Sequence, residues 1–160
     1  MEIERKWLVD INNIPFDLSK YEHFDIEQSY LMFKPTIRIR RIRNKNEYVL
    51  TIKSSSKDKL SRQEYEISID QKLYEEMLGK KKGLTIVKTR YRIPVDNHIY
   101  EIDIFKNEYE GLAYLEIEFE NIDEAKRYQE PEWIKKEVTY LKGYSNSSLA
   151  KGNKKLFKNE

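Results

Sequence analysis

The start of the chain places three charged side chains at alternate positions: Glu2, Glu4 and Lys6. In a β-strand, alternate side chains project from the same face, so two carboxylates and an ammonium group would stand in a row. Such a row suits a cation beside an anion. It is also what a solvated strand face looks like, because charged side chains normally face water. The rest of the chain has to decide between these two interpretations.

Charges of one sign recur on alternate positions of later segments. Like charges two residues apart on one face repel, and solvated strands tend to mix signs. A run of cations therefore indicates a binding site for an anion, and a run of carboxylates indicates a binding site for a cation. The runs are Arg38 and Arg40; Lys88, Arg90 and Arg92; Glu101 and Asp103; and Glu116 and Glu118. Lys53 and the mixed set Arg62, Glu64 and Glu66 stand on similar faces.

The elements that must position these charges are mostly strands. Period-two alternation predicts eight of them, at about 2–9, 25–33, 36–44, 47–54, 62–69, 84–93, 99–106 and 113–120. Helices are fewer: Asp70 predicts a capped helix through about Leu78, and Asp123 predicts another that ends before Pro131. We expect a last helix that includes 147–151.

Two architectures fit these strands. In the first, the apolar faces point inward and the charges lie outside, as in an ordinary antiparallel sandwich or barrel. In the second, the strands close into a barrel whose interior is charged, and the apolar faces lie outward beneath helices and long connections. The residues alone favour the first architecture, because burying charges requires strong compensation.

Composition limits the class of protein. A chain of 160 residues fits one domain, so we expect residues 1–160 to form a single domain. The net charge of +2 gives no bulk attraction for nucleic acid, and the absence of cysteine excludes disulfides and thiolate chemistry. No apolar run approaches transmembrane length, and no secretory signal precedes the first strand. We therefore expect a cytoplasmic protein with neither nucleic acid nor membrane as partner.

The ordered set of charged motifs resembles the CYTH superfamily, or triphosphate tunnel metalloenzymes, over almost the whole chain. The resembling elements are Glu2-Ile3-Glu4-Arg5-Lys6, Gln28-Ser29-Tyr30-Leu31, Ile37-Arg38-Ile39-Arg40, Thr51-Ile52-Lys53, Arg62-Gln63-Glu64-Tyr65-Glu66, Lys88-Thr89-Arg90-Tyr91, Glu101-Ile102-Asp103-Ile104-Phe105, Gly111-Leu112 and Leu115-Glu116-Ile117-Glu118. The resemblance implies a closed eight-stranded antiparallel β-barrel with a few flanking helices, an α+β fold that is mainly β. It also implies a polyphosphate bound with a divalent metal inside the tunnel, and so favours the charged interior.

The residue types suit that chemistry, because Arg binds phosphate bidentately and Lys supplies a compact charge. The candidate substrate-binding residues are Lys6, Arg38, Arg40, Lys53, Arg62, Lys88, Arg90 and Arg92. The candidate metal ligands are Glu2, Glu4, Glu116, Glu118 and Asp103, a carboxylate set that predicts Mg²⁺ or Mn²⁺. The candidate catalytic residues are Lys6, Glu64, Glu116 and Tyr30, among which the general base is not identified.

We expect metal-dependent hydrolysis of a small triphosphate, with inorganic triphosphate favoured over a nucleoside triphosphate or another organic triphosphate. Water would attack a terminal phosphoryl group in line while cations neutralise the charge on the leaving pyrophosphate. One alternative is a class IV-type adenylate cyclase that makes cyclic AMP and pyrophosphate from ATP. Another is a non-catalytic module that binds polyphosphate or nucleotide. The oligomeric state is not predicted.

Overall fold

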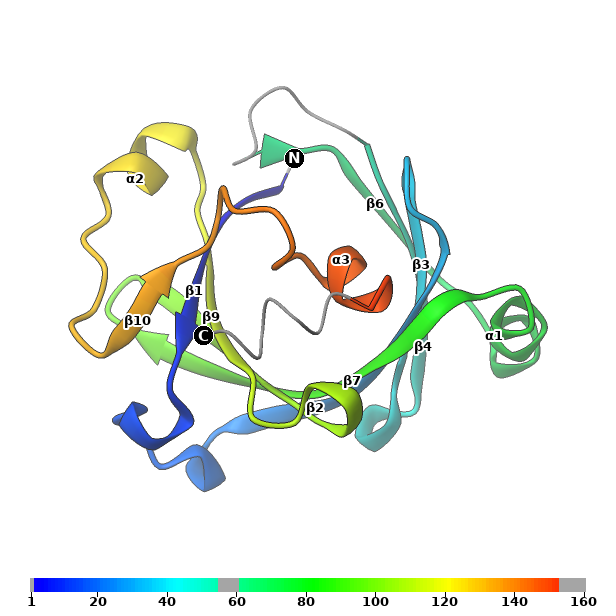
Figure 1. Cartoon of the computed structure of the whole chain (residues 1–160), viewed down its shortest axis with the longest axis horizontal. Coiled ribbons are helices and arrows are strands. Elements are labelled where there is room, and N and C mark those ends of the chain that lie inside the picture. Colours follow the sequence, from blue (N-terminus) through cyan, green and yellow to red (C-terminus); the bar gives the residue numbers. More distant parts are fainter. Residues whose placement is uncertain (1, 55–60, 153–160) are drawn as a thin grey trace.

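The computed structural model describes residues 2–54 and 61–152, which form a mainly β fold with three short α-helices (Figure 1). The strands are β1 (Glu2–Val9), β2 (Glu22–Met32), β3 (Thr36–Ile42), β4 (Glu47–Lys53), β5 (Ser61–Arg62), β6 (Glu64–Ser68), β7 (Lys82–Val95), β8 (His98–Phe105), β9 (Ala113–Glu118) and β10 (Ile134–Glu137). The helices are α1 (Gln71–Leu78), α2 (Ile122–Arg127) and α3 (Asn146–Ala150). Within these ranges, no helix is long and apolar enough to cross a membrane.

The strands pair antiparallel along one path, in the order β10, β1, β9, β8, β7, β2, β3, β4, β6. β5 lies off this path and pairs with β1, Glu2 opposite Arg62 and Ile3 opposite Ser61. Because β5 and β6 are nearly continuous in the chain, this segment contacts both β1 and β4, which are distant along the path. The predicted mainly β class is confirmed. The pairing that spans the gap is two residues long, and full closure of the barrel stays a prediction.

The outward faces of the strands are apolar and are covered by other elements. Trp7, Ile102 and Ile117 are fully buried and pack against Phe16 and Trp133, which lie outside the sheet. On another part of the wall, Tyr48 of β4 and Tyr74 of α1 share an apolar cluster, their ring centroids 5.1 Å apart. These contacts confirm that the apolar faces point outward, so the charged faces point inward.

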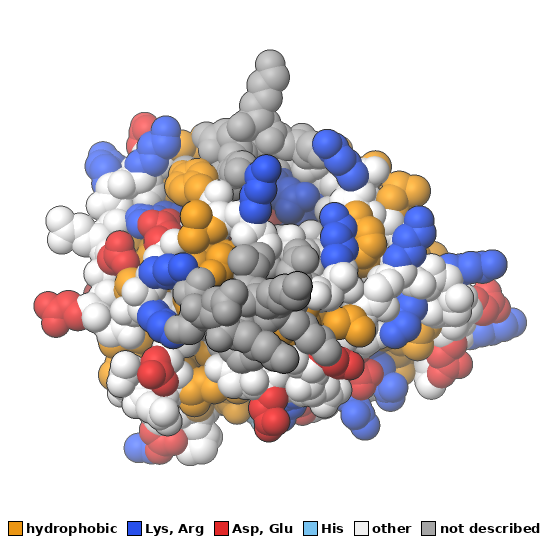
Figure 2. All heavy atoms as spheres, viewed as in Figure 1, with side chains coloured by type: hydrophobic (Ala, Val, Ile, Leu, Met, Phe, Trp, Pro, Cys, Tyr) orange, Lys and Arg blue, Asp and Glu red, His pale blue; other side chains and the backbone are white. Residues whose placement is uncertain are grey.

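The inward face of the strands is charged along one part of its length and apolar along another. Beyond the charged positions, Leu8 of β1, Phe105 of β8 and Tyr114 of β9 belong to a second apolar cluster. Leu149 and Ala150 of α3 belong to the same cluster, and Figure 1 shows α3 lying within the ring of strands. The interior is therefore apolar at the α3 end and charged beyond it. The face of the molecule seen in Figure 2 also carries both signs of charge.

The structure corrects three details of the predicted elements. β10 was not predicted, because Ile134–Glu137 lacks a clear period-two pattern; its register with β1 places Glu137 opposite Trp7. The segment predicted as one strand at 62–69 is interrupted between β5 and β6. Asp123 does not cap α2: the side chain of Asn121 accepts the capping hydrogen bond from Glu124 N, and Asp123 lies in the first turn.

Candidate active site

The inward faces enclose a cavity of about 380 Å³ whose wall is polar almost throughout. It is lined by Glu2, Glu4, Lys6, Tyr30, Arg38, Arg40, Lys53, Glu64, Glu66, Lys88, Arg90, Glu101, Glu116, Glu118 and Asn146. These residues come from β1, β2, β3, β4, β6, β7, β8, β9 and α3. Side chains that are dispersed in the sequence thus converge on one space.

At the centre of the wall, two cations are held by one carboxylate that lies behind them. Asp103 is fully buried, and its register partner across β7 and β8 is Arg90. Arg90 Nε and Nη2 donate to the two oxygens of Asp103 at 2.7 and 2.9 Å, and Lys88 Nζ donates at 2.8 Å. Although burial opposes ionisation, these two cations hold the pKa of Asp103 well below its usual range. Asp103 does not line the cavity.

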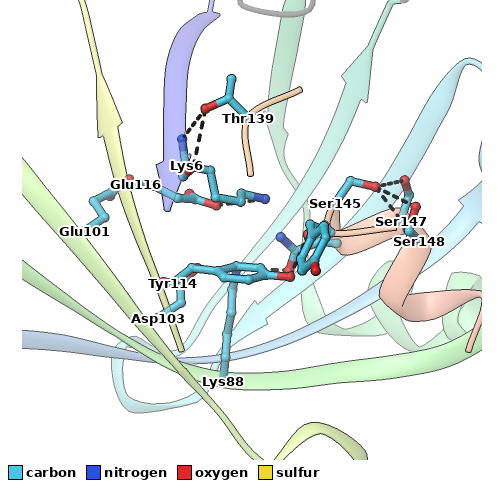
Figure 3. Close-up of polar contacts among 12 residues, drawn as sticks. Lys6, Lys88, Glu101, Asp103, Tyr114, Glu116, Thr139, Ser145, Ser147 and Ser148 are labelled. Carbon is cyan, nitrogen blue, oxygen red and sulfur yellow. Dashed lines mark hydrogen bonds and ion pairs between the residues drawn. The ribbon is translucent and has the colours of Figure 1, made fainter. Parts of the chain in front are cut away.

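Glu116 links the same cluster to the first strand. It lies opposite Lys6 in the β1–β9 register, and its Oε1 is 3.2 Å from Lys6 Nζ (Figure 3). Its other oxygen accepts from Arg90 Nη2 at 3.0 Å. Burial opposes ionisation here too, but the two cations lower the pKa of Glu116 to about 2. Both Lys6 and Arg90 are therefore held in place by a carboxylate of the protein itself.

A second group of cations is bound more loosely. Arg40 donates from Nε and Nη2 to Gln28 Oε1 at 3.1 and 2.9 Å and makes no ion pair within the described residues. Burial, with the charges of Arg38 and Arg90, lowers the pKa of Arg40 to about 10. Arg38 reaches Glu64 only at 3.8 Å, and its buried Nε has no hydrogen-bond partner among the same residues. Two arginines on β3 are thus the cations best placed to accept an anion.

Several carboxylates also line the cavity and lie close enough to affect one another. Glu4 and Glu118 lie directly opposite each other on β1 and β9, and neither makes an ion pair within residues 2–54 and 61–152. Burial and the charges of Glu116 and Glu2 raise the pKa of Glu4 to about 7; burial and the charge of Glu2 also raise the pKa of Glu118. Burial and the charge of Glu2 raise the pKa of Glu64 to about 7. Glu2 itself is paired with Lys53 at 2.8 Å.

The chemistry of this donor set fits a divalent cation. Two like charges directly opposite on neighbouring strands are destabilising without a counter-charge, and the strands place Glu4 and Glu118 in that arrangement. Carboxylate oxygens are also the ligands that hard cations prefer. In the described part of the chain, no three acidic or histidine side chains already converge at ligand distance. The carboxylates would therefore have to draw together around an ion.

Removing the charge of Glu4 should stabilise the metal-free protein at high pH. The raised pKa means that Glu4 contributes stability below its unfolded pKa and loses it as the pH rises through about 7. At pH 8 in chelator, we expect the free energy of unfolding of Glu4→Gln to exceed that of the wild type by about 1–3 kcal/mol, so that the variant unfolds at a higher temperature. Near pH 4 the two proteins should be equally stable. Thermal melting across this pH range checks the expectation, with exposed Glu110→Gln as the matched control. A stabilisation that did not vary with pH would contradict it.

Of the sequence-predicted site residues, three lie outside the cavity wall. They are Asp103, which sits behind Lys88 and Arg90; Arg62, whose side chain donates to Ser54 O and Thr36 Oγ1; and Arg92, which is 47% exposed and 3.6 Å from Glu101. The predicted residues that the structure brings together around the cavity are Lys6, Arg38, Arg40, Lys53, Lys88, Arg90, Tyr30, Glu64, Glu2, Glu4, Glu116 and Glu118.

Two polar residues near the cations were not predicted. Gln28 is fully buried, accepts from Arg40 and donates from Nε2 to Tyr30 Oη at 3.1 Å. Asn146 of α3 lines the cavity and accepts from Lys88. The inward parity of Gln28, two residues before Tyr30, was a signal that could have found it. Asn146 lies on a short helix, where strand parity gives no guide.

Comparison with known proteins gives consistent matches over most of the chain. The model of the CYTH domain family matches residues 1–152. An inorganic triphosphatase of Nitrosomonas europaea is 37% identical over 153 residues, covering 93% of this chain and 96% of the relative. An inorganic triphosphatase of Acetivibrio thermocellus is 35% identical over 159 residues, covering 98% and 97%.

Solved structures extend the likeness to the fold. The crystal structure of an inorganic triphosphatase superposes with a TM-score of 0.67 at 32% identity, covering 94% of this chain and 95% of the other. A Hippeastrum protein studied as an adenylyl cyclase, whose structure is described as revealing a dominant triphosphatase activity, has a TM-score of 0.63 at 18% identity. It covers 79% of this chain and 83% of its own, and at this identity the likeness shows the fold alone.

Proposed function

This chain belongs to the CYTH domain family, and from that premise we propose that it is a metal-dependent triphosphatase that hydrolyses inorganic triphosphate to pyrophosphate and phosphate. The observation that carries the proposal is that one cavity holds both cations and carboxylates without a close counter-charge. Arg38 and Arg40 of β3 make no ion pair shorter than 3.8 Å within the described residues, and Glu4 of β1 and Glu118 of β9 make none there at all. A metal complex of a triphosphate carries both charges that such a wall would bind.

The cations have two roles in this proposal. Arg38 and Arg40, which make no ion pair shorter than 3.8 Å with any described carboxylate, bind phosphoryl oxygens directly. Lys6, Lys88 and Arg90 are held in place by Asp103 and Glu116, so they present fixed positive charge to the substrate. Fixed charge of this kind stabilises the developing charge of the transition state without reorganisation. Asp103 is then a positioning residue for two cations.

Water attacks the terminal phosphorus in line, the bond to the bridging oxygen breaks, and pyrophosphate leaves. The proposed ligands of a divalent metal are Glu2, Glu4 and Glu118, and we propose Mg²⁺ or Mn²⁺ as the ion. When bound, the metal supplies Lewis-acid neutralisation of phosphoryl charge. The protein itself holds the phosphate chain straight between two groups of cations. One group is the arginines of β3, and the other is the cations of β1 and β7 that Asp103 and Glu116 hold in place.

The four candidate catalytic residues differ in how free they are to accept the proton of the attacking water. Lys6 and Glu116 are paired with each other, and Glu116 is also bound by Arg90. Tyr30 Oη accepts from Gln28 and belongs to the apolar cluster at the α3 end. Glu64 lines the cavity 3.8 Å from Arg38, and burial together with its other partner, the carboxylate of Glu2, raises the pKa of Glu64 to about 7. We assign the proton-accepting role to Glu64.

A substrate panel tests the proposal. With Mg²⁺ or Mn²⁺, we expect inorganic triphosphate to be cleaved faster than ATP or thiamine triphosphate, with phosphate released and no cyclic AMP formed. Excess chelator should abolish the activity, and added metal should restore it. Cyclic AMP as the main product from ATP would favour the cyclase. Tight binding of triphosphate without turnover under any metal would favour a binding module.

A further inference from the structure

Helix α3 is fixed against the barrel wall by several independent contacts. Ser145 caps it, accepting a hydrogen bond from Ser148 N. Tyr109 of the β8–β9 connection donates from Oη to Leu149 O at 2.6 Å, and Tyr114 of β9 donates to Tyr144 O at 2.8 Å. Figure 3 shows Ser145, Ser147 and Ser148 clustered at the start of the helix. The helix is therefore built into the end of the cavity.

The approach of α3 to the wall is close enough to require a glycine. Gly83 on β7 has a φ of +74°, and a Cβ added there would lie 2.2 Å from Ala150 O. Neither the backbone conformation nor the spacing would admit another residue without movement. The position of α3 is thus specified by the strand it packs on as well as by its own cap.

Asn146, the first residue of α3, faces the cavity from this fixed position. It is only 9% exposed, lines the cavity, and its Oδ1 accepts from Lys88 Nζ at 3.2 Å. A lysine ammonium can only donate, so the amide oxygen must face Lys88. The amide nitrogen therefore points elsewhere, and it has no hydrogen-bond partner in residues 2–54 and 61–152.

We propose that Asn146 is a substrate-binding residue, whose amide N–H groups donate to the oxygens of a terminal phosphoryl group at the α3 end of the cavity. The inference rests on the proposed function. Lys88, which is 2% exposed and also bonded to Asp103, supplies the charge beside that group. Asn146 adds two neutral donors in a defined direction.

This placement also defines the class of substrate. Beyond Asn146 and Lys88, the interior is filled by the apolar cluster that includes Leu8, Phe105 and Leu149. Within the described residues, packed apolar side chains occupy the space that a sugar or a base would need at that end. The phosphoryl group next to Asn146 therefore carries no organic substituent, and any substituent on the other end of the chain has to point toward the carboxylates.

The variant Asn146→Asp separates a substrate contact from mere support of Lys88. Aspartate is isosteric and keeps an acceptor for Lys88, but it removes the amide donors and faces the phosphate with a negative charge. We expect triphosphate to bind about tenfold more weakly to Asn146→Ala and about 100-fold more weakly to Asn146→Asp. Ser147→Ala, a change on the same helix away from the cavity wall, should bind as the wild type does.

Calorimetric titration with inorganic triphosphate in chelator measures these affinities, and KM and kcat are measured in parallel with metal. Melting curves establish that each variant is folded. Wild-type affinity retained by a folded Asn146→Asp protein would overturn this inference and leave the triphosphatase proposal intact. A wild type that neither binds nor cleaves triphosphate would instead overturn the proposed function.

Discussion

Arg40→Gln should lower kcat/KM for triphosphate by about 100- to 1,000-fold and leave the fold nearly as stable as before. Arg40 makes no ion pair within the described residues, and its neighbours Arg38 and Arg90 repel it. Losing its two hydrogen bonds to Gln28 is offset by relief of that repulsion, so we expect a change in unfolding free energy within about 1 kcal/mol. Triphosphate should raise the melting temperature of the variant less than that of the wild type.

Arg90→Gln is the informative contrast, because Arg90 holds Asp103 and Glu116. Its removal leaves two buried carboxylates short of counter-charge, and we expect a loss of about 3–5 kcal/mol in unfolding free energy. Arg43→Gln, at a site where the side chain is 63% exposed, controls for the substitution itself. An Arg40 variant that melts as low as the Arg90 variant, yet keeps the full triphosphate-induced shift, would show that Arg40 is structural.

Glu118→Gln should reduce turnover by about 100-fold or more at low metal concentration and recover part of it when Mg²⁺ or Mn²⁺ is raised. Glu118 is exposed to the cavity, lies opposite Glu4 and has no cationic partner among the described residues. Its proposed role is therefore to bind the ion, and neutralising it should not weaken the fold. Metal titrations of activity, with melting curves in chelator, measure both effects.

Glu116→Gln should behave differently, although it lies only two residues away. Glu116 neutralises Lys6 and Arg90, so the variant should lose about 3 kcal/mol of stability, and added metal should not recover its activity. Strand alternation and the family resemblance assign both glutamates to the metal, because both stand on one face of one strand. If added metal restored the activity of both variants equally, Glu116 would have to be counted among the metal ligands.

The strands were predictable because each keeps a strict alternation of charged and apolar positions. The direction of the charges was not predictable from alternation alone, since either face can in principle be buried. It followed from the family resemblance, and the structure confirms it through the coverings over Trp7 and Ile117. β10 escaped prediction because it is only four residues long, shows no clear alternation and pairs with the end of β1 at the edge of the sheet.

Which charged side chains pair with one another, and which line the cavity, could not be predicted because both depend on the register between strands. Asp103 serves Arg90 because β7 and β8 place them opposite each other. Arg92, two residues further along β7, is 47% exposed and lies outside the cavity wall. Period-two parity assigns both arginines to one face and gives no position along the barrel axis. The role of Asn146 could not be predicted either, because its place on the cavity wall depends on how α3 packs against the strands.

The pairing of the first strand has a consequence for how the protein folds. β2, β3 and β4 form hairpins with their neighbours in the chain, and such local contacts form quickly. β1 has no such neighbour: its partners are β5, β9 and β10, and Arg5 bonds to Glu137 across 132 residues of sequence. Closing so long a loop carries an entropic cost that must be met before these contacts can form. The row Glu2, Glu4 and Lys6 lies on the strand with the most distant partners in the sequence, and we therefore expect it to be among the last parts to reach its final position.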